Sequence, residues 1–209
     1  MKQPSRLQLG LILGLSVLLV VLVVASLVQD KPSTAAPANT ETVTFTQENP
    51  AENPVTNYTV PAKQPLSITI ANADIEGYIQ KVGVDQNKDI TAPNNVNLAG
   101  WFTDSVLPGG LGLSIIDGHV DGRTQRGIFH NLKQVKVGDE VIITYGDKST
   151  KTFTVFATHS LASDDSASSL FNQDPKVVSQ LNIITCTGKY DTASKEYRQR
   201  LIVSAKLDS

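Results

Sequence analysis

The sequence predicts an all-β domain preceded by one long apolar segment, within a chain of 209 residues. Three observations predict the β domain. Short runs of β-branched and aromatic residues recur from Pro65 onward, and several of them alternate apolar and polar residues at a period of two. Gly, Pro and Asp residues separate the runs, and helical periodicity is weak over the same stretch. Many short strands with this punctuation are typical of a β-sandwich or a β-barrel.

The apolar segment spans residues 7–28 and contains no charged residue. A helix of this length crosses the roughly 30 Å hydrocarbon core of a bilayer. Lys2 and Arg6 precede the segment and Asp30 follows it, so the positive-inside rule places residues 1–6 in the cytoplasm and the remaining chain outside the cell. A cleaved signal peptide is the alternative, but its apolar core is usually only about 7–15 residues long. We therefore expect a single-pass anchor in the cell membrane.

Residues 29–64 predict a flexible extracellular linker. The stretch is rich in Pro, Thr, Ala and Asn and shows little apolar periodicity. Such a composition buries too little apolar surface to offset the entropy lost on ordering, so we expect a loosely extended spacer. Residues 65–209 then form one folded domain that is large enough for a hydrophobic core of its own.

Within this domain, strands are predicted by β-prone runs at residues 67–70, 113–116, 141–145, 152–157, 182–185 and 201–205. Turns are predicted where Gly, Pro and Asp gather, at residues 108–110, 121–122, 146–147 and 188. Residues 175–181 predict one or two helical turns, because Asp174 is a suitable cap and Pro175 suits the first helical position.

Composition limits the classes of function. The net charge of −2 gives no indication of a surface that neutralises phosphates, so we expect no nucleic-acid partner. A single cysteine, Cys186, excludes an internal disulfide framework and a cysteine-rich zinc site. It leaves a buried apolar side chain, a reactive thiol or an intermolecular disulfide. Because a lone thiol outside the membrane is exposed to oxidation, its presence there favours a working thiol.

Cys186 follows the β-prone run 182–185 and is followed by Thr187-Gly188, so it lies where a strand gives way to a loop. A thiol needs a base or a positive environment to act as a nucleophile at neutral pH. Among the three histidines, His119 is the favoured partner because it also lies at the exit of a β-prone run. His130 reads as a half-buried structural residue, and His159 as a solvated one.

Arginine is the second candidate partner of the thiol. Arg198 and Arg200 both precede the apolar run 201–203, and their spacing of two places them on one face of a strand. A guanidinium can donate to the negative charge that develops on a carbonyl oxygen during acyl transfer. A surface charge at a strand start is the alternative for either arginine.

Several blocks of sequence, in this order, resemble those of the sortases, the cysteine transpeptidases of bacterial surfaces. The blocks are Trp101-Phe102, Pro108-Gly109, Gly112, Ser114-Ile115-Ile116-Asp117-Gly118-His119, Phe129, Asn131-Leu132, Val137-Gly138-Asp139-Glu140-Val141, Ile184-Thr185-Cys186 and Arg200-Leu201-Ile202-Val203. They cover essentially residues 65–205. Ile183 departs from the family pattern, in which a threonine or its equivalent stands two residues before the threonine that precedes the nucleophile.

The resemblance implies a closed eight-stranded β-barrel with short helices, behind a membrane anchor. It assigns the catalytic residues to His119, Cys186 and Arg200, and substrate positioning to Thr185. Arg200 is preferred over Arg198 because it directly abuts the apolar run. The resemblance also implies that residues 159–178 influence the choice of substrate. That segment holds no ordered cluster of acidic ligands, so we expect no metal, and the implied reaction needs no cofactor.

Asp117 stands at a position that a small residue often holds in the family. Its carboxylate either raises the basicity of the nearby imidazole or points to solvent.

The implied activity is cleavage of an LPxTG-like sorting signal in a secreted protein, through a thioester on Cys186. Transfer then goes to an amine of a cell-wall precursor or of another protein, such as a pilin. Two alternatives remain open from sequence: a thiol hydrolase on the same fold, and a membrane-tethered β-barrel that binds a partner without catalysis.

Overall fold

The computed structural model describes residues 58–86 and 88–209. The predicted anchor at residues 7–28 and most of the predicted linker therefore lie outside the described residues. Within the described ranges, no helix is both long and apolar enough to cross a bilayer.

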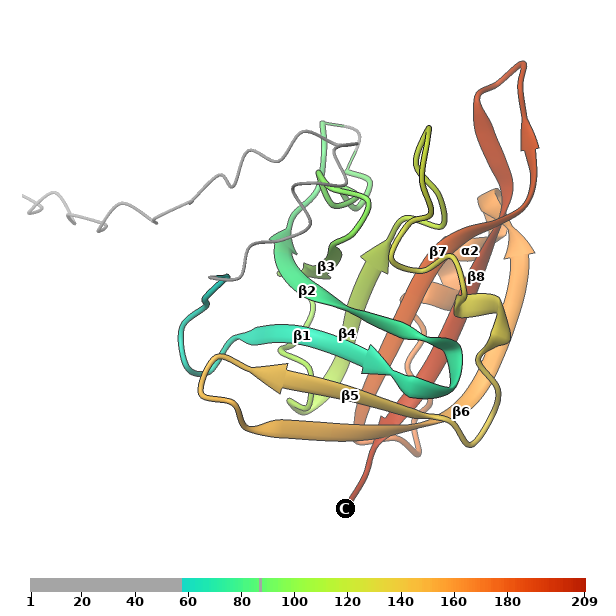
Figure 1. Cartoon of the computed structure of the whole chain (residues 1–209). Helices are drawn as coiled ribbons and strands as arrows, with labels where there is room; N and C mark the ends of the chain where they lie inside the picture. The colour runs from blue at the N-terminus through green and yellow to red at the C-terminus, as the bar shows by residue number, and fades with distance from the viewer. Residues whose placement is uncertain (1–57, 87) are drawn as a thin grey trace, which may run out of the picture. The chain divides into compact units, whose positions relative to one another are not determined.

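Eight strands close into a barrel, which confirms the predicted all-β architecture (Figure 1). The elements are β1 (Pro65–Ile70), η2 (Ala71–Ala73), β2 (Ile75–Val82), β3 (Ala99–Phe102), β4 (Gly112–Gly118), η3 (Leu132–Gln134), β5 (Glu140–Tyr145), β6 (Thr150–Ala162), α2 (Ser163–Leu170), β7 (Ser179–Asp191) and β8 (Glu196–Leu207). Around the barrel the strands follow the order β1-β2-β3-β4-β7-β8-β6-β5, with β5 closing onto β1.

Two pairs of neighbouring strands are parallel, β2 with β3 and β4 with β7, and the other pairs are antiparallel. The β4–β7 pair matters most for function, because it places the C-terminal end of β4 beside the middle of β7. His119 follows the end of β4, and Cys186 lies on β7. Two segments that are remote in sequence are therefore neighbours in the barrel.

Alternating side chains divide between two apolar clusters. The larger cluster fills the barrel and includes Ile116, Ile183 and Val203. The smaller cluster includes Ile115, Ile184 and Ile202, which are the neighbours of the first set in sequence. Because successive side chains of a strand point to opposite faces, the smaller cluster lies on the outer face of the barrel. Leu170 of α2 belongs to it, so this helix covers part of that face.

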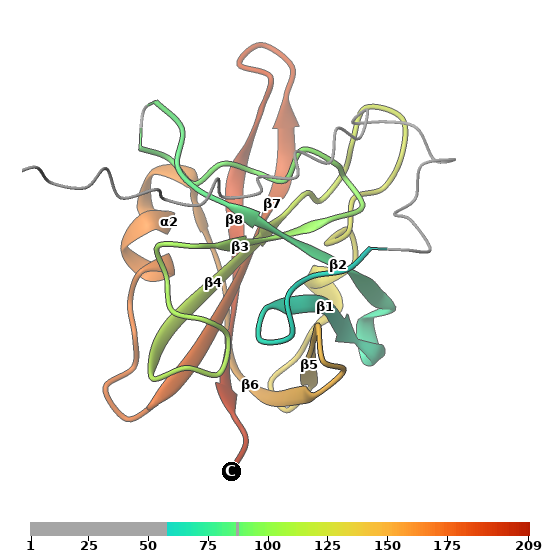
Figure 2. The ribbon, with the colours of Figure 1, turned by 90° about the vertical axis from the view of Figure 1, so that its left-hand side faces the viewer.

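The strands β7 and β8 continue well beyond the barrel as a hairpin, which projects at the top of Figure 2. Tyr190 and Tyr197 are partners across this hairpin and their rings meet edge to face at 5.2 Å. Arg198 forms an ion pair with Asp191 one step further along. Aromatic and opposite-charge pairs of this kind stabilise antiparallel strands, which explains why both strands run longer than predicted from sequence.

The predicted helical turns at residues 175–181 are wrong. The chain makes a turn at Pro175 and Lys176, and β7 begins at Ser179. The side chain of Gln180 accepts a hydrogen bond from the Asp174 backbone and donates one to the Asn172 carbonyl. This network and the pairing of β7 with β4 satisfy the backbone in an extended form. The helix of this connection is α2, which the sequence did not predict.

The described part of the chain before β1 packs against the barrel. The Tyr58 hydroxyl donates a hydrogen bond to the Ile79 carbonyl at 2.6 Å, and the rings of Tyr58 and Tyr78 lie 5.1 Å apart. The final residues of the predicted linker thus contact β2.

Candidate active site

Cys186 and Arg200 are direct partners across the β7–β8 pair. Cys186 shares its face of β7 with Ile184, and Arg200 shares its face of β8 with Ile202, because each pair is two residues apart. Both Ile184 and Ile202 belong to the outer cluster. The thiol and the guanidinium therefore lie side by side on the outer face, and both residues are half-buried.

Asp117 joins the same face from the neighbouring strand. It is the register partner of Ile184 across the parallel β4–β7 pair, and it lies two residues after Ile115 of the outer cluster. Its Oδ1 accepts a hydrogen bond from the Gly118 amide at 2.7 Å. A carboxylate, a thiol and a guanidinium thus occupy three adjacent strands.

Burial has the largest effect on the pKa values of both Asp117 and Cys186. It raises the pKa of Asp117 to about 6, against lowering contributions from the Gly118 amide, His119 and Arg200. Burial also raises the pKa of the Cys186 thiol, with Arg200 acting in the opposite direction and Asp117 and Glu196 adding to the rise. In the substrate-free protein the thiol is therefore mostly protonated at neutral pH, and its conversion to a thiolate needs a base.

His119 lies directly after β4, and its ring is held by one strong contact. Nε2 lies 2.7 Å from the carbonyl oxygen of Pro93, in the connection between β2 and β3. A carbonyl oxygen can only accept, so Nε2 must carry a proton. Within the described residues Nδ1 makes no hydrogen bond, and it is the ring atom left to accept or release a proton. The contact fixes the tautomer as well as the orientation of the ring.

Two close approaches fix the backbone around His119. A Cβ on Gly118 would lie 2.5 Å from the Phe129 ring, and a Cβ on Gly127 would lie 2.2 Å from the His119 carbonyl oxygen. The Phe129 amide donates to that same oxygen at 2.9 Å. Glycine at both positions lets the segment before η3 pack directly on the chain that carries the imidazole.

Thr185 points into the barrel, opposite to Cys186 on the strand. Its hydroxyl donates to the Gly118 carbonyl at 2.7 Å, and the side chain is buried. The structure therefore links the residue before the nucleophile to the residue before His119. The predicted contact between Thr185 and substrate stays a prediction.

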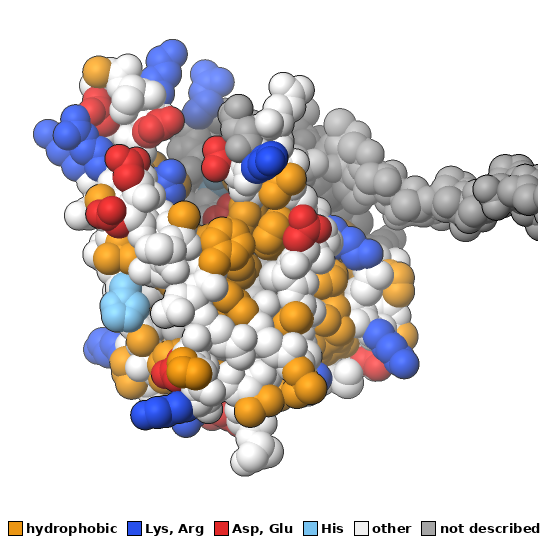
Figure 3. Space-filling view, turned by 180° about the vertical axis from the view of Figure 1, so that it is seen from behind, with side chains coloured by type: hydrophobic (Ala, Val, Ile, Leu, Met, Phe, Trp, Pro, Cys, Tyr) orange, Lys and Arg blue, Asp and Glu red, His pale blue; other side chains and the backbone are white. Residues whose placement is uncertain are grey.

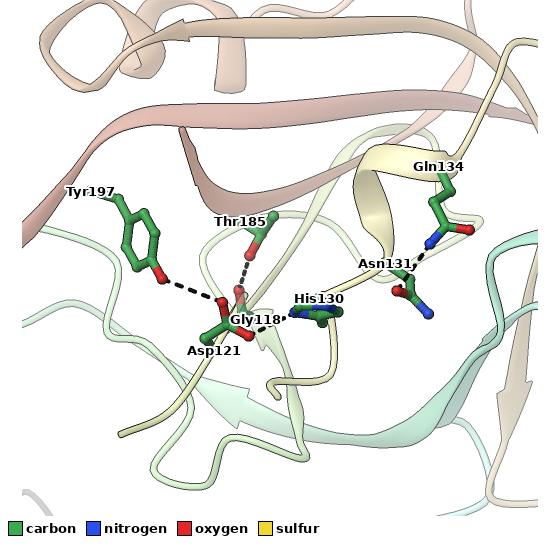
Figure 4. A network of polar contacts seen from close by, with 7 residues as sticks. All are labelled: Gly118, Asp121, His130, Asn131, Gln134, Thr185 and Tyr197. Carbon is green, nitrogen blue, oxygen red and sulfur yellow. Dashed lines mark hydrogen bonds and ion pairs between the residues drawn. The ribbon is translucent and has the colours of Figure 1, made fainter. Parts of the chain in front are cut away.

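Asp121 is the centre of a polar network that sequence reasoning missed (Figure 4). His130 Nδ1 donates to Asp121 Oδ1 at 2.7 Å, and the Tyr197 hydroxyl donates to Oδ2 at 3.4 Å. The network joins the chain beyond His119 to the projecting part of the β7–β8 hairpin. Because its members are distant in sequence, no local motif indicates it. His130 is the half-buried structural residue that the sequence predicted.

Two other residues considered as partners of the thiol, His159 and Arg198, lie elsewhere in the structure. His159 is exposed on β6, as predicted. Arg198 pairs with Asp191 on the hairpin, so Arg200 is the arginine placed opposite Cys186. Among the residues that the structure describes, no group of His, Cys, Asp and Glu side chains could hold a metal ion.

An apolar strip runs along the outer face toward Cys186 and Arg200. Its buried members come from five strands and α2: Val82, Phe102, Ile115, Leu170, Ile184 and Ile202. Figure 3 views the face that carries α2, and it shows hydrophobic side chains gathered in the middle with charged side chains along the upper rim. Phe171, just after α2, is 53% exposed and meets Phe102 edge to face. Because the buried members of the strip are at most 7% exposed, Phe171 rather than the strip itself offers apolar surface to a peptide on this face.

Comparisons with known proteins agree on the family. A model of the sortase domain matches residues 68–208. A lid mutant of sortase A from Corynebacterium diphtheriae has a similar structure, with 26% identity, a TM-score of 0.54, and coverage of 75% of this chain and 75% of that chain. No curated protein sequence matches the chain.

Two further solved structures share the fold. A sortase D5 transpeptidase from Clostridium perfringens has 24% identity and a TM-score of 0.52, covering 70% of this chain and 79% of that chain. Sortase C1 from Streptococcus agalactiae has 20% identity and a TM-score of 0.52, covering 73% of this chain and 71% of that chain. At these identities the likeness concerns the fold alone.

Proposed function

Because the chain belongs to the sortase family of cysteine transpeptidases, we propose that it cleaves an LPxTG-like sorting signal in a secreted protein and joins the new carboxyl end to an amine. The observation that carries this proposal is the pairing of Cys186 with Arg200 on the outer face, beside the end of β4 where His119 stands. This pairing supports a nucleophile with a cation beside it, and the position of His119 after the neighbouring strand supports its role as the base.

In the first step, His119 Nδ1 takes the thiol proton and the Cys186 thiolate attacks the carbonyl carbon of the scissile peptide bond. The fixed tautomer supports this role, because Nε2 is committed to the Pro93 carbonyl and only Nδ1 can accept the proton. The C–N bond then breaks, the imidazolium protonates the leaving amine, and a thioester on Cys186 remains.

Arg200 has the complementary task. During the attack, negative charge develops on the carbonyl oxygen, and a guanidinium that is already in place stabilises that charge without reorganising. Its position opposite Cys186 supports the role. The same cation lowers the pKa of the thiol against the effect of burial, so it also favours the thiolate.

In the second step, an amine attacks the thioester carbon and gives its proton to His119. The Cys186–carbonyl bond breaks, and a new amide bond forms with the acceptor, which we take to be a cell-wall precursor or another protein such as a pilin. The exposed ring of Phe171, which packs against Phe102, supports binding of an apolar residue of the sorting signal. Residues 7–28 would anchor the enzyme in the cell membrane with its catalytic domain outside.

The test is a ligation assay with the full-length chain and a Cys186→Ala variant. Each is incubated with a quenched LPxTG-type peptide, with and without triglycine, and the products are identified by mass spectrometry. We expect a triglycine-linked product from the parent chain only. Cleavage without ligation would show that the chain is a hydrolase rather than a transpeptidase. Turnover by the Cys186→Ala variant would overturn the assignment of the nucleophile.

A further inference from the structure

The guanidinium of Arg200 is held at one end by a set of hydrogen bonds. Nη1 donates to the Ser163 hydroxyl at 2.9 Å, to the Tyr197 carbonyl at 2.9 Å and to the Gln199 carbonyl at 3.2 Å. Within the described part of the chain, Nη2 and Nε make no hydrogen bond. One nitrogen is thus devoted to anchoring, and two remain to donate to a substrate.

Ser163 provides the one side-chain oxygen in this set. It follows the last residue of β6 and begins α2, and Leu161 of β6 is the register partner of Arg200. Its hydroxyl donates to the Tyr197 carbonyl at 3.1 Å while accepting from Nη1. The hydroxyl, the carbonyl and the guanidinium therefore form a closed triangle in which each group has a complementary role.

The Ser163 hydroxyl does not cap helix α2. The residue in the cap position of α2 is Ala162, and no side chain caps the helix. A serine at a helix start often bonds the free amides of the first turn, but here its hydrogen bonds go to the strand that carries Arg200. The interaction thus serves the arginine rather than the helix.

An arginine side chain has many rotamers, and holding its planar fork in one orientation costs conformational entropy. A group that must meet a developing charge gains from being fixed before the substrate arrives. Anchoring Nη1 with three hydrogen bonds leaves the planar guanidinium few orientations.

We propose that Ser163 is a positioning residue for Arg200, fixing the guanidinium so that Nη2 and Nε are presented to the carbonyl oxygen of the scissile bond. The inference rests on the proposed function, because it assigns Ser163 a part in the same reaction. It also ties Arg200 to the start of α2, the helix that covers the apolar strip.

The experiment compares the steady-state ligation kinetics of full-length Ser163→Ala and Ser163→Thr variants with those of the parent. Alanine removes the hydroxyl, and threonine keeps it. We expect alanine to lower kcat about tenfold with little change in KM for the peptide, since the lost contact acts in the transition state. Threonine should restore most of kcat. Ser149→Ala is the control, because it removes a hydroxyl that donates a hydrogen bond to Asp147, in the turn between β5 and β6.

A second comparison separates positioning from a loss of stability. In an Arg200→Ala background, Ser163→Ala should lower the residual rate no further, because residues that act through one another are not additive. Parent-like kcat for Ser163→Ala would overturn the inference while leaving the proposed function intact. An additive loss in the Arg200→Ala background would also overturn it. Failure of the parent chain to ligate would instead overturn the proposed function.

Discussion

Arg200 on β8 stands directly opposite Cys186 on β7, on the outer face of the barrel, although a hairpin of residues 187–199 separates them in sequence. The pairing is set by strand register, so it needs no loop to fold over the site. The two strands continue beyond this pair as a hairpin, in which Tyr190 and Tyr197 pair after a register shift between Thr187 and Tyr190. The positive charge is therefore built into the same sheet as the thiol.

Removing this charge should make the thiol harder to ionise. Arg200 lowers the pKa of Cys186, so an Arg200→Ala variant should have a higher thiol pKa than the parent. We expect the pH profile of iodoacetamide alkylation to move to higher pH. The rate of Cys186 alkylation, followed by intact mass between pH 6 and pH 10, measures the shift.

A matched variant should move the profile the other way. The Asp117 carboxylate raises the pKa of the thiol, so Asp117→Asn should shift the alkylation profile downward. Asp104→Asn, which changes an exposed carboxylate between β3 and β4, should leave it unchanged. Shifts of the same sign for the Arg200 and Asp117 variants would contradict the assigned electrostatics.

Asp117 should also reduce stability at neutral pH. Its pKa in the folded protein is about 6, above the ordinary value of 3.8. The fold therefore favours the protonated carboxyl. This favourable contribution to the free energy of unfolding is complete below about pH 4 and is lost as the pH rises through about 6. Asp117→Asn should raise the free energy of unfolding by about 2 kcal/mol at pH 7.5 and hardly at all at pH 4. Urea unfolding at both pH values tests this, and equal effects at the two would count against it.

Thr185 should support the backbone beside His119. Thr185→Val keeps the shape of the side chain but leaves the buried Gly118 carbonyl without its hydroxyl donor. We expect a loss of about 1–3 kcal/mol in stability together with a lower kcat, whereas Thr185→Ser should retain both. Chemical denaturation and ligation kinetics of the two variants provide the comparison. Equal behaviour of valine and serine would show that the hydroxyl is dispensable.

Asp121 should connect the chain after His119 to the segment before η3. Asp121→Asn loses the charged partner of His130 and weakens the contact with Tyr197. We expect a stability loss of about 1 kcal/mol, since the pair is only half-buried. Tyr197→Phe, which removes only the longer of the two hydrogen bonds, should cost less. A larger loss for the Tyr197 variant would reverse the predicted order of the two contacts.

Much of the barrel could be predicted because local patterns agree with the final structure. The run 201–205 alternates between the inner and outer clusters, and the run 182–185 does the same before Cys186. The triad residues could be named because their sequence blocks resemble a known family, and the structure places Cys186 and Arg200 opposite one another.

The missed helix shows where local patterns fail. Residues 163–170 are mostly Ser, Asp and Ala, and Leu170 is their one large apolar side chain, so their apolar periodicity is weak. The helix forms because Leu170 packs into the outer cluster and the Ser166 hydroxyl bonds the Ser163 carbonyl. Residues 175–181 carry helix-start signals, but pairing with β4 and the contacts of Gln180 override them.

The contacts of the site could not be predicted from sequence for a related reason. The hydrogen bond that Arg200 donates to Ser163 and the one that Tyr197 donates to Asp121 join residues that only the folded barrel brings together. Serine, aspartate and tyrosine are common on protein surfaces, so their types alone do not indicate partners. Only the strand order and register bring these side chains within hydrogen-bonding distance.

The most direct test is to look for the thioester itself. The full-length chain is mixed with an LPxTG-type peptide without acceptor amine, quenched in acid at short times, and examined by intact and peptide mass spectrometry. We predict an adduct with the mass of the acyl fragment on Cys186, released by neutral hydroxylamine and missing from the Cys186→Ala variant. Peptide cleavage with no adduct at any time, or an adduct on another residue, would contradict the account.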